Sequence, residues 1–290
     1  MSAGIARPGD VINQGTVWPA EFSQAHAPTV EVGAGGAAEV YAWRPGQVCK
    51  LLRRPFNVER AEREWNALVL GTAHRLPVPT PIRRGIVDSR PAVIMERLYG
   101  RRLSAAIKTR PWKWWSAGLA LGSVHALIHS VPIHGSGGLP SLKSLVAADV
   151  EAGDLPAALR AATLKALAEL PVGDRLLHGD FRASNVVDTD RGLIVIDWDD
   201  AAIGPPEADV ALTDLLLSLG SSGRLTSLAN SRVILKQYQR SYRKAAALAL
   251  NEEHVKAWRP ICAARWLSQG ELGAEMRGRL LAELRPLAER

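Results

Sequence analysis

Residues 178–200 read HGDFRASNVVDTDRGLIVIDWDD, and this stretch decides the fold of the 290-residue chain. Residues 193–196 form a short apolar run, rich in β-branched side chains, that follows a turn signal made of Arg191 and Gly192. A second apolar pair, at residues 186–187, precedes that turn. The pattern predicts two short strands joined by a hairpin turn at residues 189–192.

A hairpin brings its two ends together, so we expect Asn185 and Asp197 to lie side by side. One side-chain carbonyl and one carboxylate make an oxygen site that suits Mg²⁺, which completes its shell with water and phosphate oxygens. Asp180, five residues before Asn185, is left to receive or orient a hydroxyl proton. The alternative is that all three are ordinary turn residues, because Asp and Asn favour turns for local reasons.

The ordered set His178-x-Asp180-x-x-x-x-Asn185, followed by a strand ending at Asp197, resembles the catalytic loop and metal-binding aspartate of the protein-kinase-like fold. Gly179 and the wording Ile-Asp-Trp at residues 196–198 are more similar to the aminoglycoside phosphotransferase and choline kinase branch. The resemblance implies an α+β, bilobal fold. Its small N-terminal lobe holds an antiparallel β-sheet and one helix, and its larger C-terminal lobe is mainly α-helical.

This resemblance divides the chain into an extension at residues 1–28, an N-lobe at 29–96 and a C-lobe at 97–290. In the N-lobe, two strand-like runs flank a glycine-rich turn that contains Gly35 and Gly36. Backbone amides in such a turn can approach phosphate oxygens closely. Ala38 stands where the third glycine of the kinase pattern would fall. No Ser or Thr hydroxyl lines the turn, so we expect any phosphate contact here to come from the main chain.

Lys50 lies within an apolar run at residues 48–52. A buried strand does not normally carry a lone lysine unless the charge meets a partner. The resemblance implies that Lys50 touches the α- and β-phosphates of the nucleotide and pairs with a helix glutamate. We expect that partner to be Glu64, with Glu62 as the second choice.

The next apolar strand, at residues 91–98, ends in charge. The resemblance implies that it is the last strand of the N-lobe and runs into the linker that holds the adenine. Main-chain groups from Glu96 to Leu98 are expected to form hydrogen bonds with the adenine base. The helix at residues 61–70 is expected to present an apolar face of Trp65, Leu68 and Val69.

Further along the chain, His125 falls on the apolar stripe of a helix, which favours a core position over a catalytic one. The resemblance implies that Asp209 braces the catalytic loop. Pro260 is expected to kink or break its helix, since proline removes a backbone donor.

Composition sets limits on the class of protein. The two cysteines, Cys49 and Cys262, cannot make a disulfide framework, and no Cys/His cluster has zinc spacing, so we expect a reducing cytoplasm. No signal peptide and no membrane-spanning run is evident. The formal charge of +7 is compatible with attraction of anionic nucleotides.

The motif set, read through the resemblance, predicts an enzyme that transfers the γ-phosphate of ATP to a hydroxyl of a small molecule with the help of Mg²⁺. Asp180 is the expected base, and Arg182, two positions later, is a cation expected to stabilise the transferring phosphoryl group. Two other functions stay open. One is a catalytically weak, nucleotide-binding pseudokinase with a regulatory role, which is disfavoured because every chemical position is filled. The other is a basic nucleic-acid binder, which is also disfavoured.

The identity of the acceptor is not decided by the sequence. An aminoglycoside is a polycation and needs an acidic pocket, for which the candidate residues are Asp199, Asp200, Glu271 and Glu275. The net positive charge of the chain does not favour that choice. A macrolide, an amino alcohol, a sugar-like metabolite and a protein acceptor also stay open.

Overall fold

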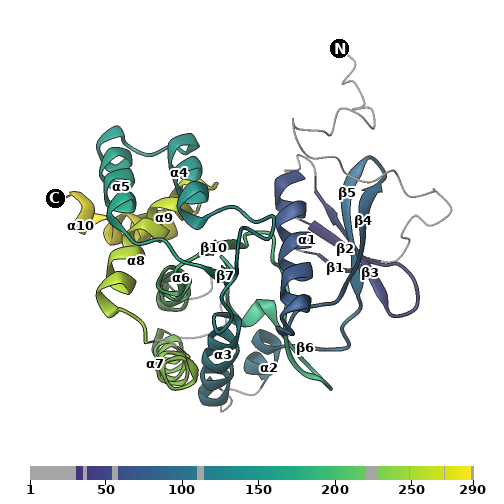
Figure 1. Ribbon diagram of the computed structural model, residues 1–290. Helices are drawn as coiled ribbons and strands as arrows, with labels where there is room; N and C mark the ends of the chain where they lie inside the picture. The colour runs from purple at the N-terminus through teal and green to yellow at the C-terminus, as the bar shows by residue number, and fades with distance from the viewer. Residues whose placement is uncertain are drawn as a thin grey trace.

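A computed structural model describes residues 31–34, 38–53, 58–109, 114–219, 228–247, 249–270 and 272–288. It confirms the bilobal α+β architecture (Figure 1), with a five-stranded sheet in one lobe and mainly helices in the other. The predicted extension at 1–28 and the glycines Gly35 and Gly36 lie outside the described residues.

The N-lobe contains β1 (Glu31–Ala34), β2 (Ala38–Ala42), β3 (Gln47–Leu52), α1 (Val58–Ala73), β4 (Pro81–Val87) and β5 (Arg90–Glu96). The strands pair antiparallel in the order β1-β2-β3-β5-β4, so β3 lies at the centre. Both neighbours of Lys50 on β3, Cys49 and Leu51, are buried in an apolar cluster on one face of the sheet. Lys50 therefore projects from the opposite face.

Helix α1 buries a different face from the one expected. Leu68 is fully buried, but Trp65 is only half-buried and Val69 is 44% exposed. The buried positions instead include Ala61 and Gly71, and a side chain at Gly71 would collide with Val78. Small residues let the helix approach its neighbours closely, and this turns Val69 toward solvent.

The remaining elements form the C-lobe and are β6 (Gly100–Arg102), α2 (Leu103–Thr109), α3 (Trp114–Ile128), α4 (Leu142–Ala152), α5 (Ala157–Glu169), β7 (Arg175–Leu177), η3 (Ala183–Asn185), β8 (Val186–Thr189), β9 (Gly192–Val195), β10 (Ala202–Gly204), α6 (Pro206–Leu219), α7 (Leu228–Ala245), α8 (Glu252–Ser268), α9 (Ala274–Glu283) and α10 (Arg285–Ala288). None of the helices in the described part of the chain is both long and apolar enough to cross a bilayer.

The predicted hairpin is present. Strands β8 and β9 pair antiparallel, with Thr189 opposite Gly192 at the turn and Val186 opposite Val195 at the open end. The N–H of Ile196 donates to the carbonyl of Asn185 at 2.9 Å, which joins the two chain segments that leave the hairpin. Strand β6 adds to the other edge of β8.

Helices α3 and α7 pack very closely because α3 carries two glycines on the shared face. A Cβ atom at Gly118 would collide with the carbonyl of Ile234, and one at Gly122 would collide with the carbonyl of Tyr238. This close packing places His125 of α3, and His129 directly after its end, against the hydroxyls of Tyr238 and Tyr242 of α7. His125 is fully buried, as the apolar stripe predicted.

Of the kink or break expected at Pro260, the break does not occur, because α8 continues through it to Ser268. Proline costs the helix one hydrogen bond, but its neighbours Trp258, Ile261 and Ala263 are fully buried in the C-lobe core. Burial of a large apolar side chain is worth about 1.5–3 kcal/mol, so packing on both sides of the proline keeps the helix continuous.

Candidate functional site

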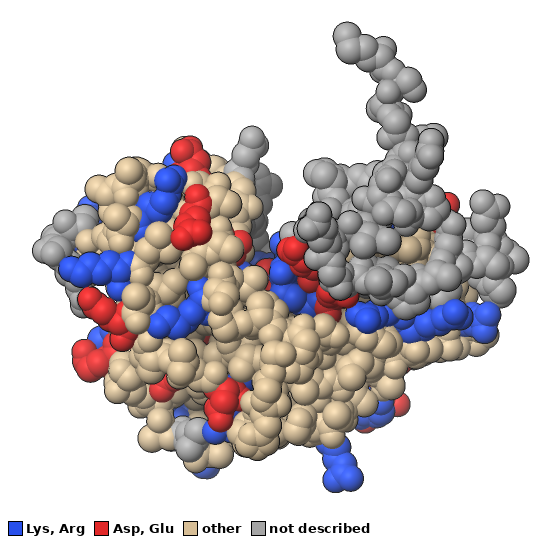
Figure 2. Space-filling view, turned by 45° about the horizontal axis from the view of Figure 1, so that its top comes forward, with Lys and Arg blue, Asp and Glu red and all other residues tan. Residues whose placement is uncertain are grey.

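A cavity of about 630 Å³ lies between the lobes and contains most of the residues singled out in the sequence. The N-lobe lines it with Lys50 and Glu64, and the C-lobe lines it with Asp180, Arg182 and Asp197. Figure 2 shows acidic and basic side chains gathered where the two lobes meet. The cavity is therefore strongly polar at its centre.

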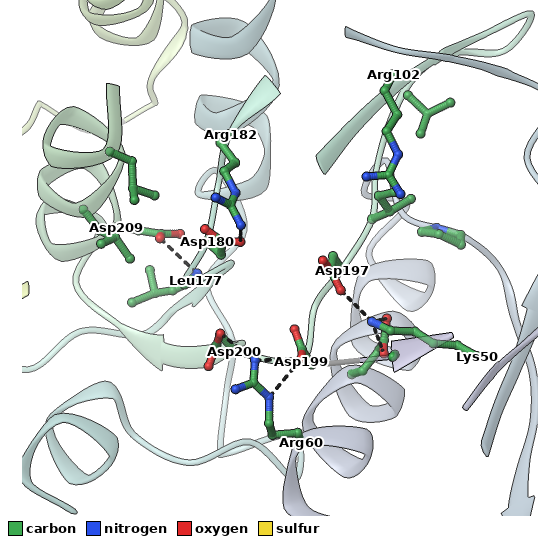
Figure 3. A pocket seen from close by; sticks show the side chains of 18 of the residues that line it. Lys50, Arg60, Arg102, Leu177, Asp180, Arg182, Asp197, Asp199, Asp200 and Asp209 are labelled. Atoms are coloured by element: carbon green, nitrogen blue, oxygen red, sulfur yellow. Dashed lines mark hydrogen bonds and ion pairs between the residues drawn. The ribbon is translucent and has the colours of Figure 1, made fainter. Parts of the chain in front are cut away.

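Lys50 is held by two carboxylates from different parts of the chain. Its Nζ lies 2.9 Å from Glu64 Oε1 on α1 and 2.6 Å from Asp197 Oδ1 after β9 (Figure 3). Burial alone would lower the pKa of Lys50, but the charges of Glu64 and Asp197 outweigh it and raise the pKa above its ordinary value. Glu62, the second choice of partner, instead bonds to Arg84 at 3.2 Å.

Asp197 has a left-handed backbone conformation, with φ of 71°. This region is uncommon for residues other than glycine, although aspartate and asparagine enter it more readily than most. The positive charge of Lys50 lowers the pKa of Asp197 to about 2, so its carboxylate is ionised at neutral pH. Strained residues of this kind persist where the surrounding structure holds them, often at functional sites.

Asp180 lies on the loop between β7 and η3. Its Oδ2 accepts a hydrogen bond from Asn185 Nδ2 at 3.0 Å and is 2.7 Å from Arg182 Nη2. Burial raises the pKa of Asp180 to about 6, although the neighbouring Arg182 and His178 oppose the rise. A carboxyl with this pKa is a better proton acceptor near neutral pH than an ordinary aspartate.

Asn185 and Asp197, the predicted magnesium ligands, both carry side-chain oxygens of the kind that Mg²⁺ binds. The backbone hydrogen bond from Ile196 to Asn185 brings the two positions together, as the hairpin predicted. Asn185 uses its Nδ2 toward Asp180, and its Oδ1 receives only a long 3.4 Å bond from Ser184. Asp197 lines the cavity with 43% of its side chain exposed. Both residues thus have oxygen capacity for a hard cation.

The loop that carries Asp180 is held in place by hydrogen bonds to Asp209 on α6. The carboxylate of Asp209 accepts the N–H of His178 at 2.6 Å and that of Gly179 at 3.1 Å. Burial would raise the pKa of Asp209, but hydrogen bonds from His125 and His129 hold it well below the ordinary value. Asp209 is therefore a buried, ionised residue that stabilises the conformation of this loop.

His178 connects the same loop to the strand before Asp197. Its Nδ1 accepts the N–H of Asp180 at 3.1 Å, so the proton resides on Nε2, which lies 3.0 Å from the carbonyl of Ile196. Gly179 has φ of 78°, and a Cβ there would collide with the carbonyl of Asp200. Only glycine fits this position without displacing the backbone.

The end of β5 and the linker that follows it line the cavity with Glu96, Arg97 and Leu98. The N–H of Glu96 donates to Thr80 at 3.0 Å, and that of Arg97 donates to Gly46 at 2.8 Å. The side chain of Glu96 pairs with Arg191 of the β8–β9 turn at 2.7 Å. Within the described part of the chain, the main chain of Leu98 has no such partner.

The idea of an acidic acceptor pocket is not supported. Arg60, which sequence reasoning overlooked, lies between Asp199 and Asp200 and contacts their carboxylates at 2.8 and 3.0 Å (Figure 3). Glu275 is exposed and does not line the cavity, and Glu271 lies outside the described residues. No sequence signal pairs Arg60 with aspartates about 140 positions away, so only the folded chain reveals the neutralisation.

The two lobes, the central lysine and the Asp180 loop define a kinase-like fold. Residues 29–248 match the model of the phosphotransferase enzyme family, so the chain belongs to that family. A search of curated protein sequences finds no significant match.

Several solved structures share the fold at low sequence identity. A thermostable mutant of aminoglycoside phosphotransferase APH(4)-Ia, in a ternary complex with AMP-PNP and hygromycin B, is 18% identical with a TM-score of 0.63, covering 88% of this chain and 92% of that one. Amicoumacin kinase hAmiN, in complex with AMP-PNP, Ca²⁺ and amicoumacin, is 13% identical with a TM-score of 0.63, covering 93% and 90%. A choline/ethanolamine kinase family protein from Mesorhizobium loti is 16% identical with a TM-score of 0.59, covering 92% and 90%.

Proposed function

We propose that this protein transfers the γ-phosphate of ATP to a hydroxyl group of a small molecule. The observation that carries the proposal is the meeting of Lys50, Asp180 and Asp197 in one cavity, where Lys50 lies 2.6 Å from Asp197. Asn185 is buried behind the cavity lining and donates to Asp180 at 3.0 Å. Phosphoryl transfer depends on positioning and charge neutralisation, and these four residues supply both. Membership of the phosphotransferase enzyme family supports the same conclusion.

In this proposal Asp180 orients the acceptor hydroxyl and takes its proton. The pKa of about 6 leaves the carboxyl largely ionised at neutral pH while keeping it basic enough to hold a proton. Arg182 lies 2.7 Å from Asp180 and has an exposed fraction of 47%. Its guanidinium is therefore close enough to stabilise negative charge on the phosphoryl group beside the base.

Lys50 neutralises the α- and β-phosphates, and Glu64 holds it in place. Asn185 and Asp197 are the residues that hold Mg²⁺, which when bound supplies positive charge to the phosphate oxygens. Ala38, Val40, Val48 and Met95 give the cavity an apolar wall on the N-lobe side, which suits a flat base. The main chain of Leu98 is the group in the linker best placed to bond to that base.

The proposal is tested by measuring ADP release from Mg-ATP across a panel of hydroxyl compounds, with mass spectrometry of the products. Replacing Asp180 by Asn keeps the shape of the side chain but removes the proton acceptor, and is expected to lower turnover by about 10²–10⁴-fold. Asp188→Asn, on the exposed part of β8, is the matched control and is expected to leave turnover unchanged.

Nucleotide binding is measured separately by the ATP-dependent shift in melting temperature. A protein that binds Mg-ATP but phosphorylates no compound in the panel would be a pseudokinase, and the transferase proposal would then be wrong. Equal turnover by the wild type and Asp180→Asn would remove the proposed role of that carboxylate.

A further inference from the structure

The lining of the cavity extends from Asp180 to three helices of the C-lobe. Helices α4, α6 and α8 line this end with the side chains of Leu142, Val146, Leu212, Leu216, Trp258 and Trp266. Helix α6 also carries Asp209, which bonds directly to the backbone of the loop that holds Asp180. An acceptor seated against these helices would therefore have its hydroxyl within reach of the base.

The apolar character of this end is part of the fold. Val146 is 2% exposed and Trp258 is fully buried, while Leu212 and Trp266 are half-buried. Ligand sites typically combine such walls with a few polar groups that fix orientation. A compound with a hydrophobic body would bury its surface here, whereas a heavily hydrated polycation would lose water without gaining contacts.

The charged groups at this end already satisfy one another. Asp199 and Asp200 bind Arg60 at 2.8 and 3.0 Å. Arg265 lies 3.6 Å from Asp200 and 2.7 Å from Asp149. Gln269, at the exposed edge, also donates to Asp149 at 2.9 Å. An ammonium group would have to displace an arginine from Asp199 or Asp200 before it could bind there.

We infer that the acceptor is an uncharged and largely apolar hydroxyl compound, not a polycation of the aminoglycoside type. This inference rests on the proposed function, because it assigns the acceptor of that same site. It differs from the compounds named for the structurally similar proteins, hygromycin B and amicoumacin. It follows from the paired aspartates together with the apolar helix faces.

The test compares neutral alcohols built on naphthalene, decalin and steroid frames with kanamycin A as the polycation. Phosphorylation is measured with Mg-ATP, and binding is measured independently by calorimetry in the presence of Mg-AMP-PNP. We expect kcat/KM for the best neutral alcohol to exceed that for kanamycin A by about tenfold or more.

A charge placed on the apolar wall gives a second test. Leu212→Glu is expected to lower kcat/KM and binding for the neutral alcohols by about tenfold or more, with the KM for ATP unchanged. Leu281→Glu is the matched control, because Leu281 is 38% exposed on α9 and does not line the cavity. Thermal melting of both variants establishes that they are folded.

The two proposals fail in different ways. If kanamycin A binds more tightly or reacts faster than every neutral alcohol, or if no neutral alcohol binds, the inference about the acceptor is overturned. If kcat/KM and binding for the neutral alcohols are unchanged in Leu212→Glu, the inference about the acceptor is also overturned. Binding of neutral alcohols that is lost in Leu212→Glu, without any phosphorylation, would support the apolar site and count against the transferase proposal.

Discussion

Replacing Arg182 by Ala tests how the cation beside the base contributes to catalysis. Arg182 Nη2 lies 2.7 Å from Asp180 Oδ2, and the charge of Arg182 is the largest influence that opposes the burial-driven rise in the pKa of Asp180. Without it the pKa of Asp180 rises further. Since the base must be ionised to accept a proton, activity then falls at a higher pH than in the wild type.

The size of the shift follows from the exposure of the pair. The side chains of Arg182 and Asp180 are 47% and 24% exposed, so solvent screens much of their attraction. A pair of this kind is worth about 0.5–1 kcal/mol, and one pKa unit corresponds to about 1.4 kcal/mol. We therefore expect the pKa of the base to rise by about 0.4–0.7 units in Arg182→Ala.

The assay is the pH dependence of kcat/KM for the best acceptor of the panel. In the wild type the acidic side of the profile is expected to fall through a pKa of about 6. The pH at which activity falls is expected to be higher in Arg182→Ala. It is expected to return to the wild-type value in Arg182→Lys, which keeps the charge. At pH 8, where the base is ionised in all three proteins, a remaining loss of about 10–100-fold would measure stabilisation of the phosphoryl group.

The two readouts separate the two possible roles of Arg182. A shifted profile with an unchanged plateau would leave only the effect on the base. If the profile stays in place and the plateau changes by less than about threefold, Arg182 has neither role and the reasoning is refuted.

Three further outcomes are expected. Glu64→Gln removes one of the two carboxylates that hold the buried Lys50, and we expect the KM for ATP to rise about tenfold in steady-state kinetics, whereas Glu62→Gln is expected to change little. Chelation with EDTA is expected to abolish turnover, and added Mg²⁺ is expected to restore it in the wild type but not in Asp197→Ala. Asp209→Asn gives the backbone N–H groups of the Asp180 loop a weaker hydrogen-bond acceptor. It is expected to lower the free energy of unfolding, measured in urea at pH 7, by about 3 kcal/mol. Because the pKa of Asp209 is depressed in the folded state, its contribution is complete above the unfolded pKa of about 4 and declines at lower pH, so the difference between variant and wild type is expected to shrink in acid.

The hairpin at the centre of the site was predictable because it is local. Its turn signal, its apolar runs, Asn185 and Asp197 all lie within a segment of about twenty residues. Antiparallel pairing of the two strands then determines which positions meet. Lys50 was recognisable for a different reason, since a charge in an apolar strand requires a partner. The choice of Glu64 as that partner agrees with the contact of 2.9 Å.

The helices were less predictable where packing decided between alternatives. Val69 belongs to an apolar pattern in the sequence, yet it faces solvent because Gly71 allows α1 to approach Val78. Pro260 signals a break, yet burial of the residues around it keeps α8 continuous. In both cases packing in the folded chain outweighed a local preference.

The sequence alone determined which residues are candidates for the chemistry, because the motif and its family resemblance predict a lysine, a base and two oxygen ligands in a bilobal fold. Only the tertiary structure decided the electrostatic state of the cavity. Arg60 reaches Asp199 and Asp200 from another lobe, and Arg265 reaches Asp200 from α8. Attraction between charges depends on their distance in space and on the water that surrounds them, and neither quantity can be read from their order along the chain.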